Sequence, residues 1–316
     1  MSLKYFLKRL ARGILTVAIA VVIIFFLMRV APSDPAAMLA SEDATPEDIE
    51  AIREAWGLNK PYTEQFMIYL RSLVTGDAGM SYLYAVNAPL YSVTELVLSR
   101  LPNTIKLACT SILISVCVSI PIGILMGIKP NSWFDNLMSA VCFVINAFPT
   151  FFMGLMLLLI FGLRLHMLPT GGNTDPGSVI LPAVTLSAHF SVTLIRMTRT
   201  EFIHVMSSNF IRTTKAKGLS DMAILFIHGL RNVSIPLVTL IGLRLGTMLG
   251  GSVVVETLFR WPGIGNLLIT AVNGRDYPTV QFLVPYIALV FVVVNLIVDL
   301  LYGVLDPRIK TGHSNE

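Results

Sequence analysis

The chain has 316 residues, of which 54% are hydrophobic and only 13% charged, and its formal net charge at pH 7 is +4. Soluble domains carry about 25% charged residues, so this sequence lacks the charge that a water-facing surface needs, and a soluble enzyme or a disordered segment is excluded. The positive excess is also too small to indicate a nucleic-acid partner. We therefore expect a membrane protein whose main contact is lipid.

Six apolar stretches are predicted to cross the membrane, because a helix needs roughly 20 apolar residues to span the hydrocarbon core. Lys and Arg are enriched in the segments that lie on the same side of the membrane as the N-terminus. This predicts that both termini are cytoplasmic. The first stretch also resembles a signal peptide, but no small-x-small cleavage site follows it, so we expect a retained helix. The stretches are 13–28, 107–128, 136–163 (a single tilted span), 176–195, 232–255 and 277–298.

The outer loop that follows the first span is predicted to form a small helical region. Acidic residues outnumber basic ones in 31–100. The sequence Thr45-Pro46-Glu47-Asp48 has a capping hydroxyl, a proline at the first helical position and acids in the first turn, so it predicts a helix start, with Gly57 as its end. A second helix is expected from about Thr63 to Leu73, closed by Gly76.

The segment 196–236 is predicted to lie in the cytoplasm between two spans. Asn209 can cap a short helix over 210–217, Gly218 suits the left-handed position that ends it, and Ser220 can cap the next helix. Positive-inside topology alone places cations in such a loop. A glycine turn between two capped helices is more than topology requires, and it favours a surface that docks into another protein.

These residues resemble a known family. Thr213–Leu219, followed by His228–Asn232 and Pro236, is similar to the coupling loop of ABC-importer permeases of the dipeptide/oligopeptide/nickel (binding-protein-dependent) family, first-permease type. Other motifs agree in the same order along almost the whole chain. They are Arg9, Ala31-Pro32-Ser33-Asp34-Pro35-Ala36, Gly57-Leu58-Asn59-Lys60-Pro61, Gly76-Asp77-Ala78-Gly79-Met80-Ser81, Arg100-Leu101-Pro102-Asn103-Thr104, Leu168-Pro169, Gly250–Glu256, Trp261-Pro262-Gly263-Ile264-Gly265, Arg275-Asp276-Tyr277-Pro278 and Asp306-Pro307-Arg308-Ile309.

The sequence departs from the general importer pattern, in which Glu-Ala-Ala precedes the glycine by three residues. Here those positions hold Arg212, Thr213 and Thr214, and Pro236 lies farther from Gly218 than in the general form. Both departures look like features of the peptide/nickel branch. The residues that the resemblance assigns to ATPase coupling are Arg212, Thr213, Thr214, Lys215, Ala216, Lys217, Gly218 and Leu219.

The resemblance implies an all-α membrane protein with six transmembrane helices and the type I ABC importer permease fold, with a small helical extracytoplasmic region after the first span. The expected regions are 1–30 (N-terminus and first span), 31–94 (outer loop), 95–305 (five spans with a coupling loop at 204–231) and 306–316 (cytoplasmic tail).

The resemblance also implies a function. The chain would be a non-catalytic permease subunit in the inner membrane of a bacterial cell, forming half of a pathway for peptides or for nickel and its chelates. Its expected partners are a second homologous permease, two cytoplasmic ATPases that bind the ATP, and an extracytoplasmic substrate-binding protein. The substrate itself (dipeptide, oligopeptide, nickel or glutathione) is left open.

Three residues are candidates for the pathway or its outer gate. Arg244 lies near the middle of the predicted fifth span, where a charge usually faces a bundle interior or a water-filled path; a partner elsewhere in the chain is the alternative. Glu256 and Trp261 lie in an outer segment that, by resemblance, closes the pathway and meets the binding protein. For Trp261, an anchor at the membrane interface is the simpler reading.

Glycines recur every four residues in two spans and predict close helix contacts. Gly242, Gly246 and Gly250 share one face of the fifth span, and Gly123 and Gly127 share one face of the second. Packing within this chain and packing against a second permease are both open.

Several chemistries have no support in the sequence. It contains no phosphate-binding G-x-x-x-x-G-K-[ST] loop, no H-E-x-x-H pair and no G-x-S-x-G turn. Cys109, Cys117 and Cys142 lie in apolar stretches, and the histidines share no ligand spacing, so we expect neither a metal nor a cofactor. A secondary transporter would show paired broken helices in two halves, and an intramembrane enzyme would need a catalytic cluster; we see neither.

Overall fold

The computed structural model describes residues 3–30, 36–37, 44–55, 57–81, 92–216, 218, 220, 224 and 229–305. Within this part of the chain there is no strand, only one isolated bridge between Met80 and Ser92. Five described helices are apolar and long enough to cross a membrane, and a bent pair can supply a sixth span. The all-α class is therefore confirmed. The long helices are α1 (Leu3–Val30), α6 (Val93–Ile128), α9 (Ile180–Ser207), α12 (Leu230–Leu249) and α15 (Tyr277–Leu305).

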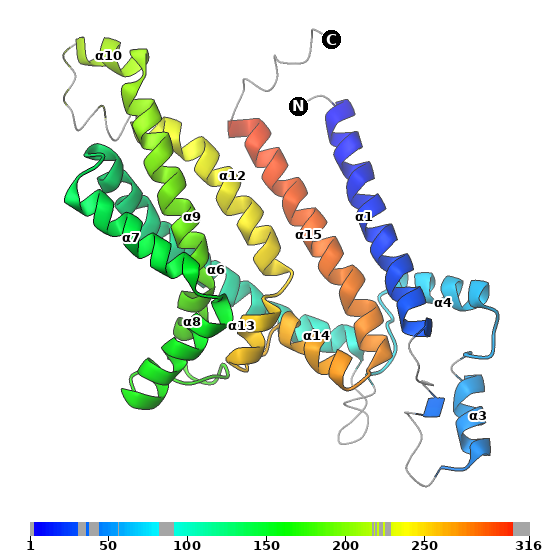
Figure 1. The fold of residues 1–316 in the computed structure, drawn as a ribbon. Coiled ribbons are helices and arrows are strands. Elements are labelled where there is room, and N and C mark those ends of the chain that lie inside the picture. Colours follow the sequence, from blue (N-terminus) through cyan, green and yellow to red (C-terminus); the bar gives the residue numbers. More distant parts are fainter. Residues whose placement is uncertain are drawn as a thin grey trace.

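Helix α9 is central to the bundle, since it contacts α6, α7 (Trp133–Ala147), α8 (Thr150–Leu157) and α12. Helix α12 lies between α9 and α15, and α1 runs along α15 (Figure 1).

The two ends of the bundle carry different short helices. The start of α1, the end of α15 and the short helix α10 (Asn209–Ala216) lie on one side (Figure 1). The opposite side carries α3 (Pro46–Ala55), α4 (Tyr62–Thr75), α13 (Val253–Leu258) and α14 (Ile264–Asn273). We call the first side the α10 side and the second the α14 side.

The predicted tilted span 136–163 is broken in the structure, although its two parts together can still supply one span. The chain bends by 101° between Trp133–Ala147 and Thr150–Arg164. Pro149 follows Phe148, whose backbone is extended (φ −93°, ψ 135°), and a proline disfavours a helical residue before it and donates no N–H. The apolar composition therefore predicted membrane residence correctly, whereas the proline sets the break.

The predicted limits of three other spans also change. Helix α6 begins at Val93 and not near residue 107, and α9 continues through Arg196 and Arg199 to Ser207. Helix α12 ends at Leu249, because Gly251 is left-handed (φ 91°) and α13 begins as a separate helix at Val253. An uncharged stretch predicts which residues can contact lipid. A helix can extend beyond these residues where other helices pack against it.

The two outer helices form as predicted. Thr45 and Asp48 cap α3 reciprocally, with Asp48 Oδ2 accepting from the Thr45 N–H (2.9 Å) and Thr45 Oγ1 accepting from the Asp48 N–H (3.3 Å). Helix α4 ends at Gly76, which has the expected left-handed backbone (φ 73°). Of the predicted first helix, Trp56 lies outside the described residues.

The glycine faces pack within this chain. A Cβ on Gly242 would lie 2.7 Å from Val298 of α15, and a Cβ on Gly123 would lie 2.6 Å from Thr198 of α9. Similar close contacts face α15 at Gly250 and α9 at Gly127. The small residues thus allow close approach of neighbouring helices in one chain, so this face of α12 is not left free for a second subunit.

Candidate functional site

The first candidate site is α10, the short helix at the end of α9. Ser208 has an extended backbone (φ −68°, ψ 150°) and separates the two helices. Ile211 and Thr214 are buried, while Thr213 is exposed and its hydroxyl donates to the Asn209 carbonyl (3.0 Å). One face of α10 therefore rests on the bundle and the other is open, and Thr214 belongs to the anchored face.

Gly218, just after α10, has the predicted left-handed backbone (φ 80°). No heavy atom lies within 4 Å of the position that a Cβ would take. The backbone conformation, and not lack of space, is thus what favours glycine here. Lys217, Leu219 and most of the predicted helix after Ser220 lie outside the described residues, as do the side chains of Arg212, Lys215 and Ala216.

The second candidate site is a buried polar cluster around Glu256 on the α14 side. Its Oε2 accepts from the Asn266 N–H (3.0 Å) and its Oε1 from the Thr104 hydroxyl (3.3 Å). The same Thr104 oxygen accepts from the Ile264 N–H (2.8 Å). Glu256 thus supplies a carboxylate at the N-terminus of α14, where a helix has unsatisfied donors. We call Glu256, Thr104 and the start of α14 the outer knot.

The outer knot is tightly closed. Glu256 is 0% exposed, and a Cβ on Gly263 would lie 2.5 Å from its Oε2. Burial raises the pKa of Glu256, and the opposing N–H and hydroxyl donors do not cancel the rise. In this structure Glu256 therefore braces the turn between α13 and α14 and does not line an open path.

Trp261 is also part of this closed region. It is 1% exposed, its Nε1–H donates to the Asn103 carbonyl (3.0 Å), and the Asn103 amide donates to the Pro262 carbonyl (3.0 Å). The ring is inside the protein, with Lys106 Nζ 5.8 Å from its centroid. Its surroundings are therefore those of a core residue, and not of an interfacial anchor.

The third candidate site is Arg244 in α12. The sequence predicted Arg244 near the middle of the fifth span. Because α12 ends at Leu249, Arg244 instead lies about 7.5 Å from the helix end on the α14 side. Its guanidinium lies over the Phe190 ring of α9, with Cζ 5.7 Å from the centroid. Its Nε is buried and makes no hydrogen bond. The alternative prediction was that Arg244 pairs with another group of this chain. No described carboxylate pairs with it.

Sequence reasoning missed a buried ion pair on the α10 side. Arg199 of α9 contacts Asp135 of α7 through two bonds, Nε–Oδ1 (2.6 Å) and Nη2–Oδ2 (2.7 Å). Asp135 also accepts from the Asn131 N–H (2.8 Å) and is 1% exposed. In the sequence, Asp135 is only the charge that flanks a predicted span. Its position after the capping Ser132 indicates a helix start. Its partner Arg199 could not be found in this way, because it lies 64 residues away.

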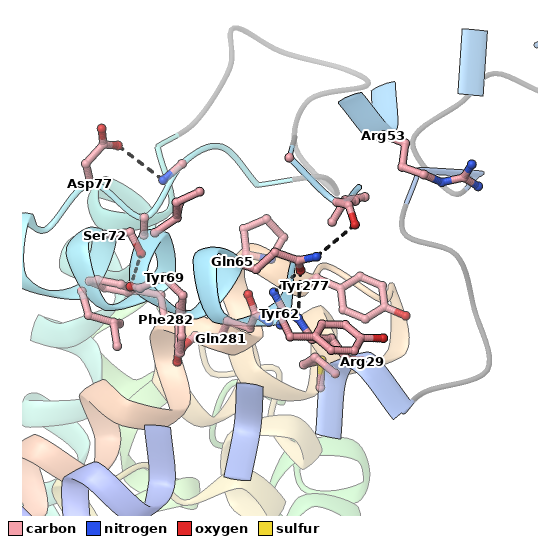
Figure 2. Close-up of a pocket in the computed structure, with 18 residues that line it drawn as sticks. Arg29, Arg53, Tyr62, Gln65, Tyr69, Ser72, Asp77, Tyr277, Gln281 and Phe282 are labelled. Carbon is pink, nitrogen blue, oxygen red and sulfur yellow. Dashed lines mark hydrogen bonds between the residues drawn. The ribbon is translucent and has the colours of Figure 1, made fainter. Parts of the chain in front are cut away.

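A cavity of about 440 Å³ lies on the α14 side, where the ends of α1, α4 and α15 meet (Figure 2). Arg29 donates to the Gln65 side-chain oxygen from Nε (3.0 Å) and Nη2 (2.8 Å), and Gln65 donates to the carbonyls of Leu58 and Lys60. These contacts satisfy the polar groups of one wall, so they join the outer helices to the first span.

The described residues contain no group of three or more His, Cys, Asp or Glu side chains that could hold a metal ion. Membrane-spanning helices, a short helix presented at one end and a closed knot at the other are together the features of a polytopic transport permease.

The comparisons with known proteins identify the family. Residues 119–311 match the family described as binding-protein-dependent transport system inner membrane component, and residues 2–108 match the N-terminal family of the same membrane component. The chain belongs to this family of ABC-importer permeases.

Relatives match along nearly their entire length. The glutathione transport system permease protein GsiC of Escherichia coli K12 is 37% identical over 308 residues, 98% of this chain and 99% of the relative. GsiC of Salmonella paratyphi A is 38% identical over the same shares. Among solved structures, an inward-facing form of the MetNI methionine ABC transporter matches with a TM-score of 0.56 and 15% identity, over 67% of this chain and 96% of that one. At this identity the match shows the fold alone, the type I importer permease fold.

The family membership confirms the predicted class. The chain is a non-catalytic, multi-pass inner-membrane component of an ABC importer, and it works with ATPase and substrate-binding partners. It decides against the secondary transporter and the intramembrane enzyme.

Proposed function

We propose that this chain forms half of a pathway for peptide-like substrates, paired with a second homologous permease and driven by two ATPases. The observation that carries the proposal is α10, a short helix that is anchored on one face, open on the other and closed by a left-handed glycine. A protein that contains no phosphate-binding loop needs such a surface to receive work from an ATPase.

The proposed coupling depends on the connection between α10 and α9. Ile211 and Thr214 anchor α10 to the bundle, so a displacement of α10 is transmitted to α9, which contacts α6, α7, α8, α12 and α13. ATPase closure would then shift the equilibrium between outward-open and inward-open states, provided that the ATPases bind the two states with different affinity. The exposed residues among 212–219 would make the contact.

The proposed orientation follows from the positions of the chain ends. The start of α1, the end of α15 and α10 share one side (Figure 1). The basic residues Lys8, Arg9 and Arg12 near the start of α1 favour the cytoplasm for that side. The α14 side, with the outer knot and the joint between α1 and α4, would then close the pathway externally and meet the binding protein.

A peptide-like substrate is supported by the curated relatives, which are named as glutathione permeases. Nickel or a metal chelate is the second candidate that the resemblance allowed. No described cluster of metal-ligating residues favours it. The uptake assay tests this candidate, because a transported metal would compete with the peptide for uptake.

The experiment that tests coupling compares two substitutions at Gly218 in the complete importer reconstituted with its binding protein. Gly218→Val strains the left-handed backbone, whereas Gly218→Asn preserves it, because asparagine tolerates this conformation. We expect Gly218→Val to retain ATP hydrolysis but lose most uptake per ATP, and Gly218→Asn to behave nearly as wild type. Normal uptake by a well-expressed Gly218→Val variant would contradict the docking role.

A further inference from the structure

One face of α9 carries polar side chains, the first of which, His189, also contacts the Phe148 carbonyl just before α8 (2.9 Å). His189, Thr193, Arg196 and Thr200 follow one another at spacings of four, three and four residues, which places them on one face of the helix. Thr193, Arg196 and Thr200 are exposed, and His189 is partly exposed. By contrast, beyond Thr16 the exposed side chains of the α1 span are apolar, among them Ile19 and Ile23. We call the four residues the α9 polar stripe.

The position of this stripe follows from the contacts of the other faces of α9. Phe190 and Leu194 pack against Val233 and Leu237 of α12, while Val192 and Ile195 pack near Cys142 of α7. The stripe lies between these two faces. A polar strip of this kind is costly against lipid tails, so it faces water or a second subunit.

Arg244 lies at the border between this stripe and α12. Its partner Phe190 directly follows His189 and is about 15 Å, or ten residues, from the start of α9. An α-helical side chain leans towards the N-terminus of its helix, which for α12 is the α10 side. The contact with Phe190 places the guanidinium between α12 and α9.

No carboxylate among the described side chains pairs with this cation. Arg244 Nε is buried without a hydrogen bond, and Asp135, an acid within the described spans, is already held by two bonds from Arg199. A buried, unsatisfied donor is unfavourable. The Phe190 ring contacts the guanidinium, with Cζ 5.7 Å from the ring centroid, but it offers no acceptor to the N–H donors.

We propose that Arg244 binds a carboxylate of the transported substrate through its guanidinium N–H groups, beside the Phe190 ring. A planar fork of N–H donors matches a carboxylate in two parallel bonds, which an ammonium cannot reproduce. The substrate class is thus a peptide-like anion with a free carboxylate. This inference rests on the proposed function, because it requires that α9 and α12 border the pathway.

The test measures ATP-driven uptake by the complete importer, reconstituted in liposomes with its binding protein. The probes are trialanine, as the free acid and as its C-terminal amide, and glutathione, as the free acid and with both carboxylates amidated. The binding protein also distinguishes acid from amide. It is identical in every reaction, however, so a change in the acid-to-amide ratio between permease variants comes from the permease.

We expect Arg244→Gln to lower the acid-to-amide ratio about tenfold, the effect of one charged hydrogen bond. Arg244→Lys is expected to retain part of the preference, since the charge remains without the fork. Arg164→Gln, which removes an exposed cation at the end of the bent pair, serves as the control and should leave the ratio unchanged.

An unchanged ratio in Arg244→Gln, or an equal loss of acid and amide uptake, would overturn the inference while leaving the proposed function intact. Substrate-independent ATP hydrolysis and co-purification of the ATPases show that each variant is assembled. If the wild-type importer drives uptake of neither probe, the proposed substrate class and this inference both fail.

Discussion

Two buried carboxylates lie on opposite sides of the bundle and are satisfied in different ways. On the α10 side, Asp135 is paired with the guanidinium of Arg199. On the α14 side, Glu256 accepts hydrogen bonds from neutral groups of Thr104 and Asn266, and no described cation pairs with it.

The difference shows what each carboxylate does. An ion pair between α7 and α9 holds two helices together, and the removal of one partner leaves a buried charge. The neutral donors around Glu256 fix the start of α14, and a neutral acceptor can replace the carboxylate there. The first site thus depends on charge and the second on hydrogen-bond geometry.

The largest effect is expected from Asp135→Ala, which leaves Arg199 partly buried without its partner. We expect a loss of about 3 kcal/mol in the free energy of unfolding, measured by thermal or denaturant unfolding in nanodiscs. The control is Asp175→Ala, because Asp175 is exposed and its side chain caps nothing. Equal stability of the two variants would show that the ion pair contributes little.

A smaller effect is expected from Thr104→Val, which removes the hydroxyl shared by Glu256 and Ile264. The buried Ile264 N–H would lose its acceptor, at a cost of about 2 kcal/mol. Thr104→Ser keeps the hydroxyl and should lose much less. The comparison of their unfolding midpoints tests whether hydrogen bonding, and not the methyl group, stabilises the outer knot.

The smallest effect is expected from Glu256→Gln, which keeps an acceptor and removes the charge. Burial raises the pKa of Glu256, so as pH rises above about 4.3, the unfolded chain loses this proton before the folded one. Wild-type stability should therefore fall relative to Glu256→Gln as pH rises towards the folded pKa. Parallel stability curves for the two proteins between pH 4 and pH 7 would contradict this.

Some of the fold and site could be predicted from local sequence. Thr45 and Asp48 cap α3, and Gly76 and Gly218 have left-handed backbones as expected, because each feature depends on residues a few positions apart. Coupling by residues 212–219 stays a prediction. The bend at Pro149 was within reach of the same reasoning, but the uncharged stretch around it favoured one continuous span.

The sequence by itself determined that this chain resides in a membrane, has about six spans and belongs among the importer permeases, since composition and ordered motifs need no coordinates. Only the tertiary structure decided that Trp261 and Glu256 are enclosed, that the glycines of α12 face α15 and that no described carboxylate pairs with Arg244. Burial and pairing depend on residues more than a hundred positions apart, such as Thr104 and Glu256. No local pattern specifies such pairs, because the packing of whole helices brings them together.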